Sequence, residues 1–474
     1  MLRARLAVAV GLLLVAAGVA GFATVGRGLR TTSVHVGAVP VELVRPDGAA
    51  AGGAARPVVV VVHGYAGSGR LMRPFADTLA RRGYVVALPD LAGHGADPER
   101  LTEAALDRDL ADVVRYVRGR PDVDPARVAL VGHSMGAAAV VRAGAADQTI
   151  RATVAISVGD DATAAIRPGP RHLLALYGAF EPSGIGATTR ATGAERVVRV
   201  RLVEHIGVLF ADRTHHETAR WLDQTLDHRP DRPVIAAKGR LIAGALGLAG
   251  GLMVLTGALL AWRTRDPAPP PERGRLGLRI AAVLVAPIPG EVAGVVLYRV
   301  LPNPVTGYLV GYFAGCGAAL LLAALLIRGP ARPARPPLAP LAFAAGFAVA
   351  ALAAVALPVH FGLTDIAPHG PDWWLVALLA GATAALLAGA HAVLGPPWSY
   401  AAVLALCLPM PVASAVGAAP GFLALISPLV MVLVALHLGL CAAARASGIP
   451  WGRTVAAGAL TIAWPVAVVL PIIG

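Results

Sequence analysis

The sequence predicts a mostly parallel α/β sheet with helices on both faces, followed by an all-helical bundle of membrane spans. From residue 57 to residue 131, short apolar runs alternate with helical segments, a pattern typical of a parallel sheet. From residue 241 onward, Ala, Leu, Val and Gly dominate stretches near the roughly 20 residues that cross a bilayer. Only 15% of the 474 residues are charged, whereas soluble domains contain about a quarter. We therefore expect a two-part membrane protein.

The first segment, residues 1–33, contains an uninterrupted apolar run at residues 6–24, which Arg3 and Arg5 precede. This run of roughly 18 residues exceeds the apolar core of a cleaved signal peptide and approaches spanning length. We expect a retained signal anchor. Cleavage is the alternative, because small residues continue up to Ala23.

The second segment, residues 34–232, has the composition of a soluble domain with acids, bases and alternating apolar runs. Short apolar runs predict strands, and amphipathic stretches predict the helices between them. The expected strands are residues 57–62, 84–88 and 128–131, and the expected helices lie near residues 71–82 and 101–118.

The third of these strands is followed by Gly132-His133-Ser134-Met135-Gly136, and then by a helix of small residues. A sharp turn between strand and helix lifts a serine clear of the sheet, and glycines on either side leave it space. The helix N-terminus favours negative charge that develops nearby. We interpret Ser134 as a nucleophile; the alternative is a serine that only caps the helix.

Two further motifs precede the serine turn in the chain. VVVVVHGYAGSG at residues 58–69 is a buried strand that ends in His-Gly, and GYVVALPDLAGHG occupies residues 83–95. Together with the serine motif, they make residues 57–226 resemble an α/β-hydrolase domain, in particular that of monoglyceride lipases and serine aminopeptidase-like hydrolases. The resemblance implies an oxyanion hole made by the backbone N–H groups of Tyr65 and Met135.

The same resemblance implies an acid after the serine in the chain. The segment RHLLALYG at residues 171–178 predicts a strand, and Glu181 follows its end. We expect Glu181 to be the acid, although this family more often carries Asp there. Asp160 and Asp161, which end the previous strand, are the alternatives.

The family's base follows the last strand of the sheet. Residues 197–203 alternate in polarity and precede Glu204 and His205, so His205 is the expected base. His215 and His216, at the start of an amphipathic helix, are alternative bases. About a dozen residues separate the strand that ends near residue 158 from the next strand, so we expect no helical lid and an open site.

The third segment, residues 233–474, contains eight further apolar stretches. Four prolines interrupt the sixth and seventh of them. The stretches are residues 241–262, 280–298, 305–327, 338–360, 373–394, 400–418, 422–444 and 455–473.

Arginines cluster in three of the short loops between these stretches, and such loops stay in the cytoplasm. The clusters are Arg263, Arg265, Arg273, Arg275 and Arg279; Arg328, Arg332 and Arg335; and Arg445 and Arg453. With nine spans and a cytoplasmic N-terminus, all three loops lie inside. The loop at residues 361–372, which lacks Lys and Arg, then lies outside together with the domain at residues 34–232.

Several classes of function are disfavoured. The net charge of +13 does not indicate nucleic-acid binding, because the basic residues lie in short loops without an aromatic-interleaved patch. The three cysteines fall inside apolar stretches, so we expect no disulfide framework and no metal site. No cofactor is implied. Glu291, beside Pro287 and Pro289, is a candidate functional residue because ionisable groups in broken spans often serve transport. The alternative is that this span is shorter and that Glu291 lies near the membrane interface.

These observations favour a serine hydrolase of the plasma membrane whose catalytic domain lies outside the cytoplasm. Its partners would be the lipid bilayer and an acyl-ester or lipid-like substrate, with an ester of a lipid or envelope component as the bond cleaved. An acyltransferase is the closest variant. The alternatives are a transport or envelope-assembly protein whose hydrolase domain modifies or binds the cargo, and a catalytically inactive receptor-like domain.

Overall fold

The computed structural model describes residues 2–48, 55–159, 166–261, 275–328, 338–368, 373–449, 452 and 454–473. The chain divides into two compact units. The α/β unit combines Ala17–Ala245 with two later segments, Val359–His369 and Pro471–Gly474. The helical unit combines Met1–Ala16, Leu246–Pro358 and Gly370–Leu470.

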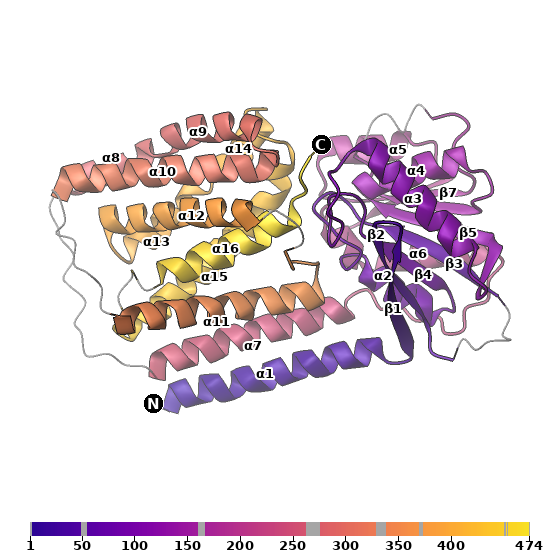
Figure 1. Cartoon of the computed structure of the whole chain (residues 1–474), viewed down its shortest axis with the longest axis horizontal. Coiled ribbons are helices and arrows are strands. Elements are labelled where there is room, and N and C mark those ends of the chain that lie inside the picture. Colours follow the sequence, from indigo (N-terminus) through magenta and orange to yellow (C-terminus); the bar gives the residue numbers. More distant parts are fainter. Residues whose placement is uncertain are drawn as a thin grey trace. The chain divides into compact units, whose positions relative to one another are not determined.

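One eight-stranded sheet forms the centre of the α/β unit, with the strand order β1-β2-β4-β3-β5-β6-β7-β8 (Figure 1). The pairs from β4–β3 to β7–β8 are parallel, whereas β1–β2 and β2–β4 are antiparallel. The mostly parallel sheet that the sequence predicted is therefore confirmed. The strands are Leu29–Val36, Val39–Pro46, Arg56–Val62, Val85–Pro89, Val123–His133, Ala152–Ile156, Leu173–Gly178 and Arg196–Val200.

Helices cover both faces of this sheet. One apolar cluster joins it to α2 (Arg73–Arg81) and α6 (Asp212–Thr225) on one face. A second cluster joins it to α3 (Glu103–Arg118) and α4 (Met135–Ala146) on the other. The short helix α5 (Ser183–Ala191) packs against β7. Because both faces are covered, the central strands are apolar without interruption.

The predicted elements lie within a few residues of the observed ones, with two differences. The antiparallel hairpin of β1 and β2 was not predicted, although it extends the sheet by two strands. The last strand, β8, ends at Val200 rather than at residue 203. The chain turns there, with Leu202 at a φ of 60°, and a short 3-10 helix, η2, follows at Gly207–Phe210.

Eight helices within the described residues are long and apolar enough to cross a membrane. Two of the spans are interrupted. The third is made of α8 (Leu276–Val285) and α9 (Pro287–Val300), and the seventh of α13 (Trp398–Leu406) and α14 (Pro409–Ala415). The others are α1 (Leu2–Gly26), α7 (Gly239–Ala261), α10 (Pro304–Arg328), α11 (Leu338–Gly362), α12 (Trp373–Leu394) and α15 (Phe422–Ala446).

The ninth predicted span differs from the structure. Its helix, α16 (Val455–Val469), has 15 residues, and an extended Leu470 and Pro471 end it. At 1.5 Å per residue this helix is about 22 Å long, which is shorter than the roughly 30 Å hydrocarbon core.

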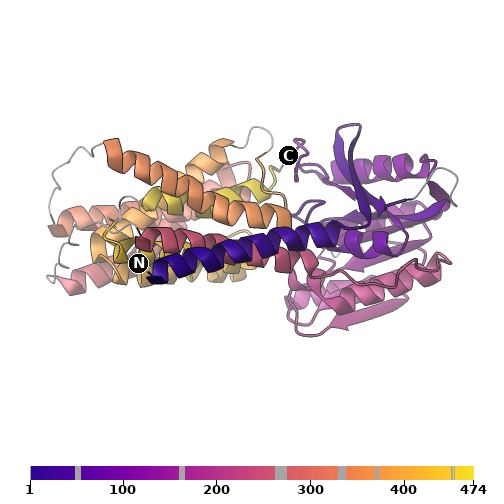
Figure 2. The same ribbon diagram turned by 90° about the horizontal axis from the view of Figure 1, so that it is seen from below.

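The first strand and two later segments of the α/β unit directly follow apolar helices in the chain. Only residues 27 and 28 separate α1 from β1, and Figure 2 shows the indigo helix continuing directly into the β-hairpin. The segment that follows α11 belongs to this unit, and there the hydroxyls of Ser68 and Thr364 lie 3.0 Å apart. At the end of the chain, the N–H of Leu101 donates to the carbonyl of Ile472 over 2.9 Å.

Candidate active site

Ser134 occupies a sharp turn between β5 and α4. Its φ is +54°, a value that side chains rarely adopt, and such strain is concentrated at functional sites. The turn depends on the two flanking glycines. A Cβ atom on Gly132 would lie 2.2 Å from the carbonyl oxygen of Gly136, and one on Gly136 would lie 2.3 Å from that of His63. A side chain at either position would therefore break the turn that presents Ser134.

Three residues from separate parts of the chain meet at this turn. The Oγ of Ser134 lies 3.0 Å from Nε2 of His205, and Nδ1 of His205 lies 3.1 Å from Oε2 of Glu181. Ser134 follows β5, Glu181 follows β7, and His205 lies between β8 and η2. The side chains of His205 and Glu181 are 4% and 1% exposed, whereas Ser134 is half-buried. The arrangement presents one hydroxyl at the surface, with a buried imidazole and carboxylate behind it.

The carboxylate of Glu181 is held by two further donors. Its Oε1 accepts hydrogen bonds from the hydroxyl of Ser157, over 2.6 Å, and from the N–H of Gly178, over 2.5 Å. Its other oxygen is thereby directed at His205. Ser157 directly follows β6 and is fully buried. The sequence did not single it out, because its role depends on β6 and β7 being neighbours in the sheet.

His133 holds the backbone at His205. Its Nε2–H donates to the carbonyl oxygen of His205 over 2.9 Å, and the two rings lie 4.8 Å apart. Burial, and next the neighbouring His205, hold the pKa of His133 well below its usual range. His133 is thus a neutral donor that fixes the loop carrying His205.

The loop after β3 passes next to Ser134. A Cβ atom on Gly64 would lie 3.0 Å from Cβ of Ser134, so only a glycine leaves room there. His63 fixes the loop, because its Nε2 accepts from the N–H of Leu91 over 3.1 Å and its Nδ1–H donates to the carbonyl of Gly64 over 2.9 Å. Burial lowers the pKa of His63 to about 4, so the ring stays neutral. The two residues expected to form the oxyanion hole are next to these positions in the chain. Tyr65 directly follows Gly64, and Met135 directly follows Ser134 as the first residue of α4.

The alternative bases lie elsewhere. His215 is buried in α6, where its Nε2–H donates to the carbonyl of Leu209 over 2.8 Å and its Nδ1 lies 3.0 Å from the hydroxyl of Thr78. Its ring also stacks on Phe75, with 4.1 Å between centroids. Burial lowers its pKa to about 4. His216, the next residue, is exposed.

The alternative acids, Asp160 and Asp161, lie outside the described residues. Among the described residues, no group of three or more His, Cys, Asp or Glu side chains is placed to hold a metal ion. The site as described therefore consists of the serine, the imidazole, the carboxylate and the backbone around them.

Glu291 lies in the helical unit, nine residues before the end of α9. At 1.5 Å per residue it is about 14 Å from that end, in the middle part of the apolar stretch Leu276–Val300. Its Oε2 accepts a hydrogen bond from the hydroxyl of Tyr308 on α10 over 2.8 Å. The helices touch closely, since a Cβ on Gly311 would lie 2.3 Å from the carbonyl of Ala293. The functional role expected of Glu291 stays a prediction.

Residues 53–184 match the family described as serine aminopeptidase, S33. This match covers β3, the loop with Tyr65, the turn with Ser134 and the residue Glu181. The α/β unit has the fold of an α/β-hydrolase domain, and its residues 53–184 are similar to this family. The helical unit lies outside the match.

Individual relatives cover only part of the hydrolase domain. An uncharacterized protein of Mycobacterium tuberculosis strain H37Rv is 38% identical over 89 residues, which are 19% of this chain and 32% of that protein. The thermostable monoacylglycerol lipase of Bacillus sp. strain H-257 is 49% identical over 47 residues, 9% of this chain and 19% of the lipase. The chain thus spans about a third or less of the length of these relatives.

Solved structures align with a larger part of this chain, and over nearly their whole length. The esterase Pf2001 of Pyrococcus furiosus aligns with 43% of this chain and 95% of its own, at 17% identity and a TM-score of 0.35. A dienelactone hydrolase from Anabaena variabilis aligns with 42% of this chain and 98% of its own, at 21% identity and a TM-score of 0.34.

Proposed function

We propose that the protein is a membrane-embedded serine hydrolase that cleaves carboxylic esters of an acylated lipid or envelope component. The observation that carries the proposal is the continuous contact from Ser134 through His205 to Glu181, with distances of 3.0 Å and 3.1 Å. A serine hydroxyl becomes nucleophilic when an adjacent imidazole accepts its proton and a carboxylate stabilises the resulting imidazolium.

In the proposed reaction, Oγ of Ser134 attacks the ester carbonyl carbon while Nε2 of His205 takes the hydroxyl proton. The carbonyl electrons move to the oxygen, and the N–H groups of Tyr65 and Met135 stabilise this oxyanion. Collapse of the intermediate expels the alcohol, which leaves with the proton from His205. Water then attacks the acyl-serine with His205 again as base, and the carboxylic acid departs. An alcohol in place of that water would make the protein an acyltransferase.

The test is labelling by a fluorophosphonate probe, which phosphonylates activated serines. We expect the full-length protein to be labelled and to hydrolyse short-chain esters. Ser134→Ala should abolish both while leaving the melting temperature unchanged, because loss of the nucleophile lowers turnover by about 10⁶-fold in comparable enzymes. The matched control is Ser33→Ala, an exposed serine on β1.

Full labelling of Ser134→Ala would remove Ser134 from the mechanism. Absence of labelling in the folded wild-type protein would favour the cargo-binding alternative, which the partly buried Glu291–Tyr308 pair keeps open. In that alternative, the apolar helices carry the main function and the hydrolase domain only binds or modifies the cargo.

We also propose that the hydrolase domain lies outside the cytoplasm, because arginine-rich loops favour the cytoplasmic side. The packing supports the number of spans on which this orientation depends. The segment after α11 is expected on the same side of the membrane as the hydrolase domain, and its Thr364 lies within hydrogen-bond distance of Ser68. An error in the number of spans before this segment would put a bilayer between these partners.

Protease protection tests the orientation. A protease added to intact spheroplasts should digest the hydrolase domain, whereas a reporter fused within residues 263–279 should stay protected until lysis. The physical reason is that arginine-rich loops are retained on the cytoplasmic side. Protection of the hydrolase domain in sealed spheroplasts would reverse the orientation and point to a cytosolic substrate.

A further inference from the structure

A second feature of the α/β unit is a hollow of about 800 Å³ between the end of the sheet and the start of α7. It is formed by β8, the loop that follows it, the beginning of α6 and the first turn of α7. Its lining includes Arg199, Arg201, Leu202, Arg213, Lys238 and Ile242.

The polar lining of this hollow is strongly basic: three arginines and a lysine face a single carboxylate, that of Asp212. Lys238 lies 2.6 Å from Asp212, and Arg213 lies 2.6 Å from Glu217 of α6. Lys238 and Arg213 are at least half exposed, and such surface ion pairs contribute little, so an incoming anion can compete for them. Arginine guanidinium groups match the oxygens of a phosphate in pairs. The hollow therefore suits a phosphate group.

The apolar part of the lining indicates whether the phosphate belongs to a soluble molecule or to a lipid. Leu202 is 80% exposed and Ile242 is 56% exposed, so the hollow presents bare hydrocarbon beside its cations. Leu241 and Ile242 belong to the first turn of α7, a helix long and apolar enough to span the membrane. The first turn of such a span lies at the level of the lipid headgroups. A soluble phosphate would gain nothing from this hydrocarbon, whereas a phospholipid would cover it.

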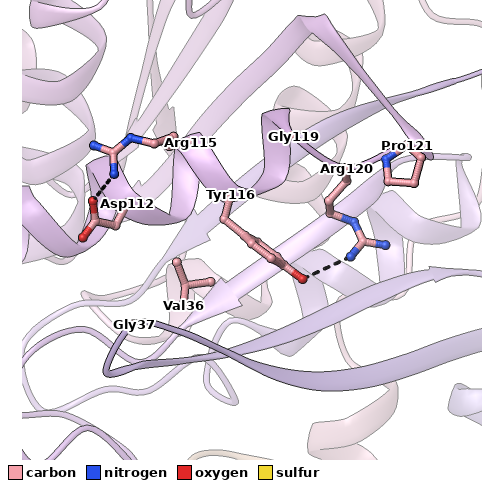
Figure 3. Close-up of a pocket in the computed structure, with 8 residues that line it drawn as sticks. All are labelled: Val36, Gly37, Asp112, Arg115, Tyr116, Gly119, Arg120 and Pro121. Carbon is pink, nitrogen blue, oxygen red and sulfur yellow. Dashed lines mark hydrogen bonds and ion pairs between the residues drawn. The ribbon is translucent and has the colours of Figure 1, made fainter.

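A second hollow on the same unit provides a contrast (Figure 3). It encloses about 590 Å³ between the turn of the β1–β2 hairpin and the end of α3. Its arginines are matched by carboxylates: Arg115 lies 2.7 Å from Asp112, and Arg120 lies 2.9 Å from Asp122. None of its lining residues belongs to a membrane-spanning helix. Arginines beside a hollow are therefore not enough to indicate a phospholipid site. The first hollow differs from the second in its excess of cations over carboxylates and in its position at the start of α7.

We propose that the hollow at the start of α7 binds the headgroup of an anionic phospholipid. The phosphate lies among Arg199, Arg201, Arg213 and Lys238, and the first methylenes of the acyl chains cover Leu202 and Ile242. The site is separate from the chemistry at Ser134, so it exists whether or not the protein is an esterase. It also touches the loop that carries His205, because Val203 and Gly207 line the hollow on either side of that residue.

The experiment measures binding to the full-length protein in detergent. The probes are dihexanoyl-phosphatidylglycerol, dihexanoyl-phosphatidylcholine and inorganic phosphate. We expect phosphatidylglycerol to bind at least about tenfold more tightly than either of the others, since each basic residue near anionic lipid contributes measurably. The variant Arg199→Gln/Arg201→Gln/Arg213→Gln/Lys238→Gln should remove this preference. A milder variant, Arg199→Gln/Arg201→Gln, should weaken it with an unchanged melting temperature.

The control variant, Arg115→Gln/Arg120→Gln, removes two arginines from the other hollow and should bind phosphatidylglycerol like the wild type. Equal affinity for phosphatidylglycerol and phosphatidylcholine would overturn the proposal, as would full binding by both of the first two variants. Equal binding of inorganic phosphate would also overturn it, because the hydrocarbon lining would then have no part. Weakening by the control to the same extent would show that only overall charge matters.

Discussion

Two buried histidines, ten residues apart in the chain, show how differently one domain can use the same side chain. His205 lies on a loop with a half-buried serine hydroxyl on one side and a buried carboxylate on the other. His215 lies in α6 between the hydroxyl of Thr78 and the carbonyl of Leu209. Both rings have two hydrogen-bond partners, so burial and hydrogen bonding alone do not separate a candidate base from a structural residue.

The charge of the hydrogen-bond partners distinguishes His205 from His215. An imidazole that takes a proton needs a negative group to stabilise its charged form, and Glu181 supplies one to His205. His215 contacts only neutral groups through its hydrogen bonds, and burial lowers its pKa to about 4. At neutral pH His215 therefore remains uncharged and contributes to packing. The comparison predicts that the two sites respond differently to substitution.

The largest effect should follow replacement of His205. We expect His205→Ala to lower ester turnover by about 10⁶-fold, because Ser134 then has no group to take its proton. The matched variant, His215→Ala/His216→Ala, should retain most of the activity per folded molecule. Single-turnover acylation by a fluorophosphonate or an activated ester measures both. The reverse ranking would place the base in α6.

A smaller loss should follow Glu181→Gln. The amide preserves the shape of the side chain but cannot stabilise an imidazolium, and the equivalent change elsewhere lowers turnover by about 10⁴-fold. Steady-state kinetics at several pH values measure the loss, with Glu195→Gln, a distant and exposed carboxylate, as the control. An unaffected Glu181→Gln enzyme would return attention to Asp160 and Asp161.

The smallest effect concerns the stability of the α6 region in acid. The pKa of His215 lies near 4 when folded and near 6.5 when unfolded. Between these values the unfolded chain binds a proton that the folded chain does not, so stability falls as pH drops from about 6.5 to about 4. His215→Gln should flatten this fall by up to about 1.4 kcal/mol per pH unit. Melting temperatures at pH 7, 6, 5 and 4 measure it.

His63 and His94 add to the same loss in wild type, since burial lowers their pKa values to about 4 and about 3. Asp90 opposes it, because burial raises the pKa of its carboxyl to about 6. The difference between wild type and His215→Gln isolates one residue from these others. Parallel pH profiles for the two proteins would show that His215 is not linked to folding.

The sequence predicted the sheet and the serine turn because both depend on local patterns. The apolar run of β3 and the spacing of Gly132 and Gly136 around Ser134 are each contained in a few consecutive residues. The hairpin of β1 and β2 was missed, although its strands alternate in polarity on both sides of Gly37. That alternation is typical of a solvent-facing hairpin and could have revealed it.

The supporting groups of the site could not be predicted in the same way. Ser157 reaches Glu181 because β6 and β7 are neighbours, and His133 reaches the carbonyl of His205 because the loop after β8 folds back over β5. Both contacts join residues that are far apart in the chain. The sequence could not decide between His205 and His215 as the base for the same reason. Each follows the last strand at a plausible distance, and only contacts with distant residues distinguish them.

The short connection between α1 and β1 has a consequence for kinetics. Because only residues 27 and 28 lie between α1 and β1, the hydrolase domain diffuses with its membrane helix rather than at the end of a long tether. For a substrate dissolved in the same bilayer, enzyme and substrate meet by lateral diffusion in two dimensions. Bulk molarity is then the wrong concentration scale. Rates should depend on the mole fraction of substrate in the lipid, and dilution with inert lipid should slow turnover at constant total substrate.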